Sequence, residues 1–305
     1  MRKTITLATH EIAEYISWSY FFHAWGFPAK YSAVTRVHGC ESCMASWVAG
    51  FEKPDEAARA AEAVKLYRDA QKVLREADGQ FDFHGRFGLF DANSDGDDII
   101  VYDDAGKATR IPFLRQQYNP SPSGDCLCLA DYIMPASAGG KKDKIGVFVA
   151  SNDGRMEQMY ADDNYRHLLY QTLSDRLAEA GTEVMHLRIR KELWGYAKDE
   201  KLSTDDIINA KYQGIRPAVG YPQMPDQSIV FILDKLIDFG EIGVSLTESG
   251  AMRPHSSTCG LMFAHPQARY FNIGKIGADQ FDDYTRRRGL PKRRMRDFLW
   301  ANLVS

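Results

Sequence analysis

Few residues in this sequence have the types and spacing of a catalytic or metal-binding site. The first such group combines histidine and cysteine. The segment HGCESC places His38, Cys40 and Cys43 at the inner spacing of half a zinc site. No second Cys-x-x-Cys or Cys-x-x-His follows to complete four ligands, so we expect free thiols and no metal here. The chain has five cysteines, and an odd number in a long sequence suits reduced thiols better than a disulfide framework.

A second candidate is the acidic run DANSDGDDIIVY. It places Asp91, Asn93, Asp95 and Gly96 where a calcium-binding EF-hand loop has them. Tyr102 stands at the twelfth position, where such a loop needs a bidentate Glu, and the flanking patterns are those of strands. Asn, Asp and Gly tolerate positive φ, so the run predicts a hairpin turn.

The elements that must position such residues can be read from hydrophobic spacing. Residues 54–78 are rich in helix formers and begin with Pro and Asp, which predicts a helix. A second, longer helix is predicted where apolar residues recur at intervals of three and four: Leu169, Leu173, Leu177, Ala180, Val184 and Leu187. The last thirty residues are expected to be helical and basic.

Strands are predicted between and after these helices. The runs are RFGLF, IIVYDDAGKATRIPF, KIGVFVA, IGVSLTES, TCGLMFAH and ARYFNIGKI. A loop dense in Gly and Pro, residues 214–228, precedes a short helix. Because the helices do not alternate with the strands, we expect an α+β fold and not a doubly wound parallel sheet.

Composition excludes several function classes. The 305 residues are 44% hydrophobic and 26% charged, with a net charge of −3, so no global positive field would attract nucleic acid. No apolar run approaches the roughly 18 residues of a membrane span, and the N-terminus lacks a signal-peptide core. We therefore expect a cytoplasmic protein, and without a linker or repeat we expect residues 1–305 to form a single domain.

The Gly- and Pro-rich loop carries a family resemblance. GIRPAVGYPQMPDQ, residues 214–227, resembles the RPAxGYPxxPDH signature of the activation domain of cobalamin-dependent methionine synthase. Further segments agree in the same order: ISWSYFFHAW, GLFDANSDGDDIIVY, CLADYI, RLAEAGTEVMHLRIRKELWGYA, LTESGAM and DQFDDYTRRRG. The resemblance covers nearly the whole chain, with an insertion at about 27–53 and a basic helical tail at 278–305.

The resemblance implies a helmet-shaped α+β domain with an antiparallel sheet and flanking long helices. Such a domain binds S-adenosylmethionine (AdoMet) in an open groove and serves the reductive reactivation of cob(II)alamin in methionine synthase. An electron reduces the cofactor to cob(I)alamin, which attacks the AdoMet methyl group, so no catalytic acid or base is expected. We expect the chain to act in trans, as a free-standing subunit, on the cobalamin-binding domain of a methionine synthase lacking this module, with a flavodoxin-like electron donor.

The resemblance also implies the residues that contact AdoMet: Glu179, Arg216, Ala218, Tyr221 and Tyr270. The ligand has a sulfonium, an ammonium and a carboxylate. Arg216 can bind the carboxylate with two parallel hydrogen bonds, and Glu179 can balance a cationic group. Ala218 offers its backbone without side-chain obstruction, and no metal site is implied.

The sequence departs from the family pattern at several positions. Ser17 stands where an Asp is typical, Gln227 where the signature ends in His, and Met224 where Cys is frequent. Loss of the early carboxylate would remove one partner for the cationic end of AdoMet, unless Glu14 or another acid replaces it.

A fragment of a second cobalamin-related motif is out of register. Asp82, His84 and Gly88 approximate the Asp-x-His-x-x-Gly signature of cobalamin-binding domains, but the glycine comes one residue too late. We therefore expect no cobalt ligand at His84.

Alternatives remain open at this stage. Ser17 and Gln227 would also suit a non-catalytic module that binds or senses cobalamin proteins, and a reactivator of a different corrinoid methyltransferase would share the AdoMet site. The basic tail is either a solvated helix face or a docking surface for an acidic partner. Its residues are Arg286, Arg287, Arg288, Lys292, Arg293, Arg294 and Arg296.

Overall fold

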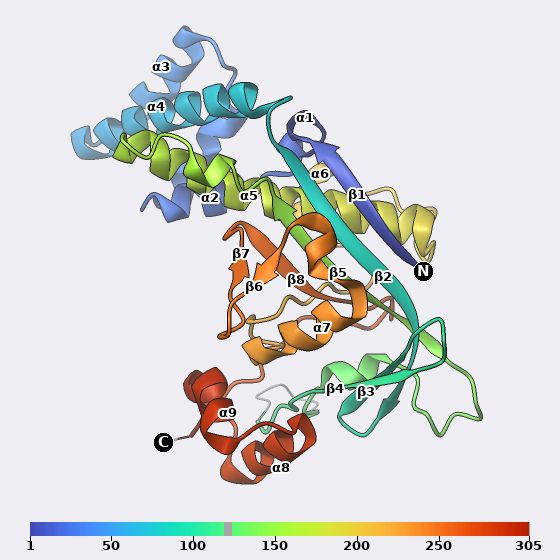
Figure 1. Cartoon of the computed structure of the whole chain (residues 1–305). Helices are drawn as coiled ribbons and strands as arrows, with labels where there is room; N and C mark the ends of the chain where they lie inside the picture. The colour runs from blue at the N-terminus through green and yellow to red at the C-terminus, as the bar shows by residue number, and fades with distance from the viewer. Residues whose placement is uncertain (119–123, 305) are drawn as a thin grey trace.

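The computed structural model describes residues 1–118 and 124–304. Its centre is an antiparallel sheet of six strands, in which β4, β3, β2, β5 and β8 follow one another and β1 also pairs with β2 (Figure 1). The strands are β1 (Arg2–Ala8), β2 (Asp82–Asp95), β3 (Asp98–Tyr102), β4 (Ala108–Pro112), β5 (Asp143–Asn152) and β8 (Ser257–Met262). Two short strands, β6 (Ser245–Leu246) and β7 (Met252–Arg253), form a separate hairpin.

The long strand β2 organises the sheet. One of its edges pairs first with β1 and then with β3, and its other edge pairs with β5 from Phe83 to Ala92. The predicted hairpin is confirmed, since Asp95 pairs with Asp98 and Gly96 has a φ of +61°. The strand continues through the polar run, so the turn is much shorter than the sequence suggested.

One face of the sheet is covered by the second of the two long helices, and the first packs against that helix. The predicted helices are confirmed as α4 (Pro54–Ala77) and α5 (Asn164–Arg188). A Cβ on Gly181 would lie 2.3 Å from the ring of Phe83, so a glycine here lets α5 approach β2 closely. Phe83, Phe87 and Phe148 of the sheet share a core with apolar residues of both helices.

The remaining helices surround this frame. In Figure 1, α2, α3, α4 and α5 gather at one end, with α8 and α9 at the other. The α-helices are α1 (Thr9–Ile12), α2 (Trp18–Ala24), α3 (Glu41–Ala49), α6 (Thr204–Ile208), α7 (Val230–Ile237), α8 (Ala278–Arg288) and α9 (Lys292–Leu299). The short 3-10 turns are η1 (Ala13–Tyr15), η2 (Ala29–Arg36), η3 (Leu129–Tyr132), η4 (Met156–Gln158), η6 (Gln227–Ile229), η7 (Phe239–Ile242) and η8 (Trp300–Asn302), and η5 (Ile189–Leu193) is a π-helical turn after α5.

The opposite face of the sheet is covered by α7. Val147 and Val149 of β5 share a second core with Val230 and Leu233 of this helix. The α+β fold expected from the sequence is therefore confirmed, with an open antiparallel sheet between α5 and α7.

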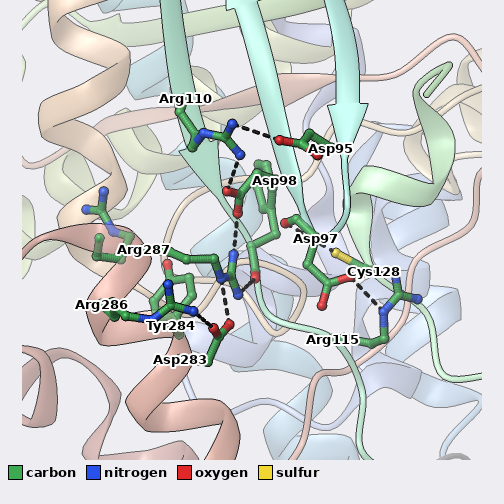
Figure 2. A network of polar contacts seen from close by, with 12 residues as sticks. Asp95, Asp97, Asp98, Arg110, Arg115, Cys128, Asp283, Tyr284, Arg286 and Arg287 are labelled. Carbon is green, nitrogen blue, oxygen red and sulfur yellow. Dashed lines mark hydrogen bonds and ion pairs between the residues drawn. The ribbon is translucent and has the colours of Figure 1, made fainter. Parts of the chain in front are cut away.

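Helix α8 is fastened to the β3–β4 hairpin by an ion pair (Figure 2). Arg287 of α8 pairs with Asp98 and, at 2.7 Å, with Asp283. Arg110 reaches the other oxygen of Asp98 at 2.7 Å. Arg287 is therefore structural, so the tail is not a uniformly solvated basic face.

Two strand predictions were wrong. The run 268–276 forms no ladder: Ile273 donates to the carbonyl of Pro222 and Ile276 to that of Asn302, so these backbone groups bind a loop and the C-terminal segment. The run 242–249 supplies only the two residues of β6. Across the part of the chain that the structure describes, none of the helices is long and apolar enough to span a bilayer.

Candidate functional site

The signature loop extends the sheet at the edge of β8. Ile215 exchanges backbone hydrogen bonds with Phe263 at 2.9 and 3.0 Å. Leu261 then donates to the carbonyl of Pro217 at 3.0 Å, and Val219 donates to that of Cys259 at 2.9 Å. Residues 215–219 thus lie beside β8 as an irregular additional strand.

Two glycines permit this close approach. A Cβ on Gly260 would lie 2.1 Å from the carbonyl oxygen of Pro217 and 2.8 Å from the Cα of Ala218. Gly214 has a φ of +84°, and a Cβ there would lie 2.1 Å from the carbonyl oxygen of Phe263. The loop can reach the edge of the sheet only because neither position carries a side chain.

Alternation along this segment divides its side chains between the two faces. Ile215 and Val219 enter the core that contains α7. Arg216 lies on the other face, where its guanidinium carbon is 5.6 Å from the ring centroid of Phe148. Ala218, two residues further, shares the side of Arg216, which faces α5.

Arg216 is held in place from several directions. Its guanidinium forms an ion pair with Glu183 of α5, and the two side chains are only 12% and 18% exposed. Its backbone N–H donates to the hydroxyl of Tyr270 at 3.0 Å. The structure thus brings together two of the predicted site residues, Arg216 and Tyr270.

Glu179 lies one helical turn before Glu183 on α5. It pairs with Arg176 at 2.8 Å and keeps 43% of its side chain exposed. Partial burial raises the pKa of Glu179, while the positive charges of Arg176 and Arg216 oppose the shift. Of the two carboxylates Glu179 and Glu183, Glu179 is therefore the accessible one, because Glu183 is engaged with Arg216.

Tyr221 follows the turn at Gly220 and presents an exposed aromatic ring. Its N–H donates to the carbonyl of Ala218 at 3.3 Å, and Gly220, with a φ of +86°, makes the turn. The side chains of Tyr221 and Tyr270 remain 55% and 42% exposed. Burial and then the charge of Glu179 raise the pKa of the Tyr221 hydroxyl, which places the two groups in one electrostatic environment.

Sequence reasoning missed two charged residues at this site. Arg176 and Glu183 lie three residues before and four residues after Glu179, spacings that put all three on one face of a helix. Glu183 also accepts a hydrogen bond of 3.5 Å from the hydroxyl of buried Tyr212. The sequence shows the spacing of Arg176, Glu179 and Glu183, but it does not show that Glu183 pairs with Arg216.

The end of the signature loop is fastened to α8. Asp226 is buried and accepts hydrogen bonds from Tyr284 at 2.8 Å and from Arg288 at 3.0 Å. Gln227 donates to the carbonyl of Gly250 at 2.8 Å. Arg288 is thus a second member of the basic tail with a structural role.

The other residues singled out from the sequence have different surroundings. Ser17 is the residue before α2, and Glu14 lines a depression with Trp18 and Tyr67, on the side of α4. Glu14 is therefore not brought to Arg216. His84 lies within β2, paired with Ser151 of β5 and 3.3 Å from the hydroxyl of Thr6.

The arrangement can bind a ligand that has both an anionic and a cationic end. Within the described residues, the Nε atoms of Arg176 and Arg216 are buried without a hydrogen-bond partner. The N–H of Ala218 makes no hydrogen bond with residues 1–118 or 124–304. Two guanidinium groups thus act on the accessible carboxylate of Glu179, and a free backbone donor lies two residues after Arg216.

Comparison with known proteins identifies the family. Residues 8–289 match the family described as vitamin B12 dependent methionine synthase, activation domain. The chain belongs to this family. A solved structure, the MetH reactivation domain bound to AdoHcy, is similar with a TM-score of 0.86 and 32% sequence identity. The alignment covers 100% of this chain and 91% of that one.

As an activation domain, the chain shares its open antiparallel sheet and long helices with a protein of known structure. The resemblance found in the sequence is thereby confirmed over most of its length.

Proposed function

We propose that this activation domain binds AdoMet in the groove between the signature loop and α5, and that it serves the reductive reactivation of cobalamin in methionine synthase. The observation that carries the proposal is the junction of Arg216, Glu183 and Tyr270, with Glu179 exposed beside it. The solved relative was bound to AdoHcy, the product of methyl transfer from AdoMet.

Each residue of the groove has a role suited to its surroundings. Arg216 would bind the ligand carboxylate with the part of its guanidinium that Glu183 does not use. Glu179 would balance the sulfonium or the ammonium group. The free N–H of Ala218 and the exposed ring of Tyr221 would receive the adenosyl part.

The groove needs no general acid or base, because no proton is transferred. AdoMet supplies an electrophilic methyl group, and cobalamin in its reduced state is the nucleophile that accepts it. The contribution of this chain is to hold and orient the methyl donor, and good alignment of reacting atoms lowers barriers by several kcal/mol, up to about 7–11 kcal/mol.

Cobalamin itself would be held by a partner. The 305 residues contain no Asp-x-His-x-x-Gly motif in register, and His84 is committed to a strand. We propose that the domain acts in trans on the cobalamin-binding domain of a methionine synthase lacking this module, in the cytoplasm, with a flavodoxin-like electron donor.

The exposed basic residues of α9 would bind an acidic partner. Arg293 and Arg294 are exposed, whereas Arg287 and Arg288 are engaged in ion pairs. Charge reversal at Arg293 and Arg294 should weaken association with the cobalamin protein or flavodoxin, with a reduced salt dependence. Unchanged, salt-dependent association would argue against this surface.

Two experiments test the proposal. Calorimetry with AdoMet should detect binding, whereas none at roughly millimolar ligand would favour a non-catalytic binding or sensing module. The domain, AdoMet and reduced flavodoxin should then restore the activity of an oxidised methionine synthase lacking this module. Binding without restored activity would indicate a different corrinoid methyltransferase as the partner.

A further inference from the structure

A second cluster of chemically competent side chains lies apart from the groove. One ligand atom each from His38, Cys40 and Cys43 lies within 4.8 Å of the others. Within residues 1–118 and 124–304, this is the only group of three or more His, Cys, Asp or Glu residues that converges in this way. Free thiols and no metal were expected here from the sequence; the two cysteines are unpaired, and the convergence of the three side chains is what now favours a metal.

The local backbone holds the three side chains on one side of a turn. Cys40 precedes the first turn of α3, and the N–H of Cys43 donates to its Sγ at 3.4 Å. The N–H of Cys40 in turn donates to Nδ1 of His38 at 3.4 Å. The positions i and i+3 of a helix start lie on one face, so the two sulfur atoms are directed toward the same point.

The cluster lies in a segment with little hydrophobic support. Residues 35–43 include no buried side chain, whereas the following part of α3 is anchored by Met44 and by a contact of Trp47 with Phe51, 5.1 Å between ring centroids. The start of α3 therefore lacks the packing that normally fixes a turn. A bound ion is a common substitute for a missing core in small segments.

We propose that His38, Cys40 and Cys43 bind one Zn²⁺ ion, with the fourth tetrahedral position left to water or to a ligand from outside the cluster. Two sulfur ligands and one imidazole are a donor set that Zn²⁺ accepts, and zinc sites with three protein ligands keep an open position. On binding, the two thiols lose their protons to solvent, two Zn–S bonds and one Zn–N bond form, and no electron is transferred. The ion fixes the start of α3.

The competing use of this motif is a redox dithiol, in which Cys40 and Cys43 form a disulfide. A dithiol does not require a third ligand, yet a ring nitrogen of His38 lies within 4.8 Å of both sulfur atoms. The convergence of three ligand atoms favours the metal.

Cobalt binding provides the test, because thiolate-bound Co²⁺ absorbs in the near ultraviolet. The full chain would be reduced, stripped with a chelator and titrated with Co²⁺ and then with Zn²⁺. We expect one ion per chain, a thiolate-to-cobalt absorption band and its loss when Zn²⁺ displaces Co²⁺. Cys40→Ser, Cys43→Ser and His38→Ala should each weaken binding by more than about 100-fold, beyond the usual effect of losing a residue outside the ligand sphere.

Matched controls separate this site from nonspecific binding. Cys126→Ser changes another partly exposed cysteine, and His255→Ala changes a histidine whose side chain is 89% exposed, so both should bind as the wild type does. Circular dichroism would confirm that each variant is folded. The proposal would be overturned if the reduced wild-type chain took up no Co²⁺, whether or not a Cys40–Cys43 disulfide forms on oxidation, or if Cys40→Ser bound Co²⁺ normally. AdoMet binding is a separate readout, so either proposal can fail alone.

Discussion

Replacing Arg216 by lysine separates the charge of this residue from its geometry. In the structure, Glu183 already occupies one nitrogen of the Arg216 guanidinium, and Phe148 lies beneath it. A guanidinium can still offer further N–H donors to a ligand carboxylate, whereas a lysine presents one compact ammonium group. We expect Arg216→Lys to keep the pair with Glu183 and to lose the contact with AdoMet.

The expected loss follows from the contact removed. A hydrogen bond to a charged group contributes about 1.5–3 kcal/mol. Since about 1.4 kcal/mol corresponds to a tenfold change, the Kd for AdoMet should rise by about 10- to 150-fold. The free energy of unfolding should change less than in a variant without any positive charge, because Glu183 would keep a cationic partner.

The assay is isothermal calorimetry with AdoMet and AdoHcy, accompanied by denaturant unfolding. Arg190→Lys is the matched control, because Arg190 is also buried, pairs with Glu200 at 2.7 Å and lies 4.0 Å from the ring centroid of Tyr212. The control should lower stability with little effect on ligand affinity. Equal losses of affinity in the two variants, or unchanged affinity in Arg216→Lys, would refute the assigned role of Arg216.

Three further predictions concern the groove and its support. Because burial raises the pKa of Glu179 above its ordinary value, AdoMet affinity should fall as the pH drops through that pKa and the carboxylate is protonated, and a titration of Glu179→Gln should show this dependence lost. Gly260→Ala places a methyl group 2.1 Å from a carbonyl of the signature loop, so calorimetry should show weakened AdoMet binding and unfolding should show a loss of about 1–3 kcal/mol, while Gly39→Ala, with open space around it, should be neutral. Asp226→Asn leaves Arg288, 6% exposed, without a charged partner and should lower the free energy of unfolding by about 3–5 kcal/mol; a loss below about 1 kcal/mol would contradict the anchoring role.

Local periodicity explains what the sequence could predict. The helices α4 and α5 follow from regular apolar spacing: α4 ends one residue before the predicted limit, and α5 contains the whole predicted apolar series. The hairpin between β2 and β3 follows from its Asn, Asp and Gly residues. In these elements, the decisive interactions lie within a few residues of one another.

The segment that contains Tyr270 shows where local pattern fails. Its alternation resembles a strand, but the edge of β8 is taken by residues 215–219 of the signature loop. With that edge occupied, residues 268–276 bond instead to Pro222 and Asn302. Which segment occupies a sheet edge depends on contacts between residues distant in the sequence, so the period of the sequence could not decide it.

The same limitation applies to charges. Glu183, Arg287 and Arg288 looked like ordinary surface residues in the sequence, yet each forms a largely buried ion pair with a residue at least 33 positions away. Such pairs stabilise the structure only when both partners are present, because a buried charge without its partner is costly. The identity of a partner so distant is a property of the folded chain.

The signature itself serves two physical purposes that a motif match does not distinguish. Arg216 pairs with Glu183 of α5, on the side of the signature loop where AdoMet binding is proposed, whereas Asp226 binds Arg288 of α8. Loss of AdoMet binding on substitution of a signature residue is therefore ambiguous, because a loosened loop and a lost contact give the same result. Only a variant that weakens binding while leaving the free energy of unfolding nearly intact identifies a ligand contact. By this criterion Arg216→Lys should report on the ligand, and Asp226→Asn on the support of the loop.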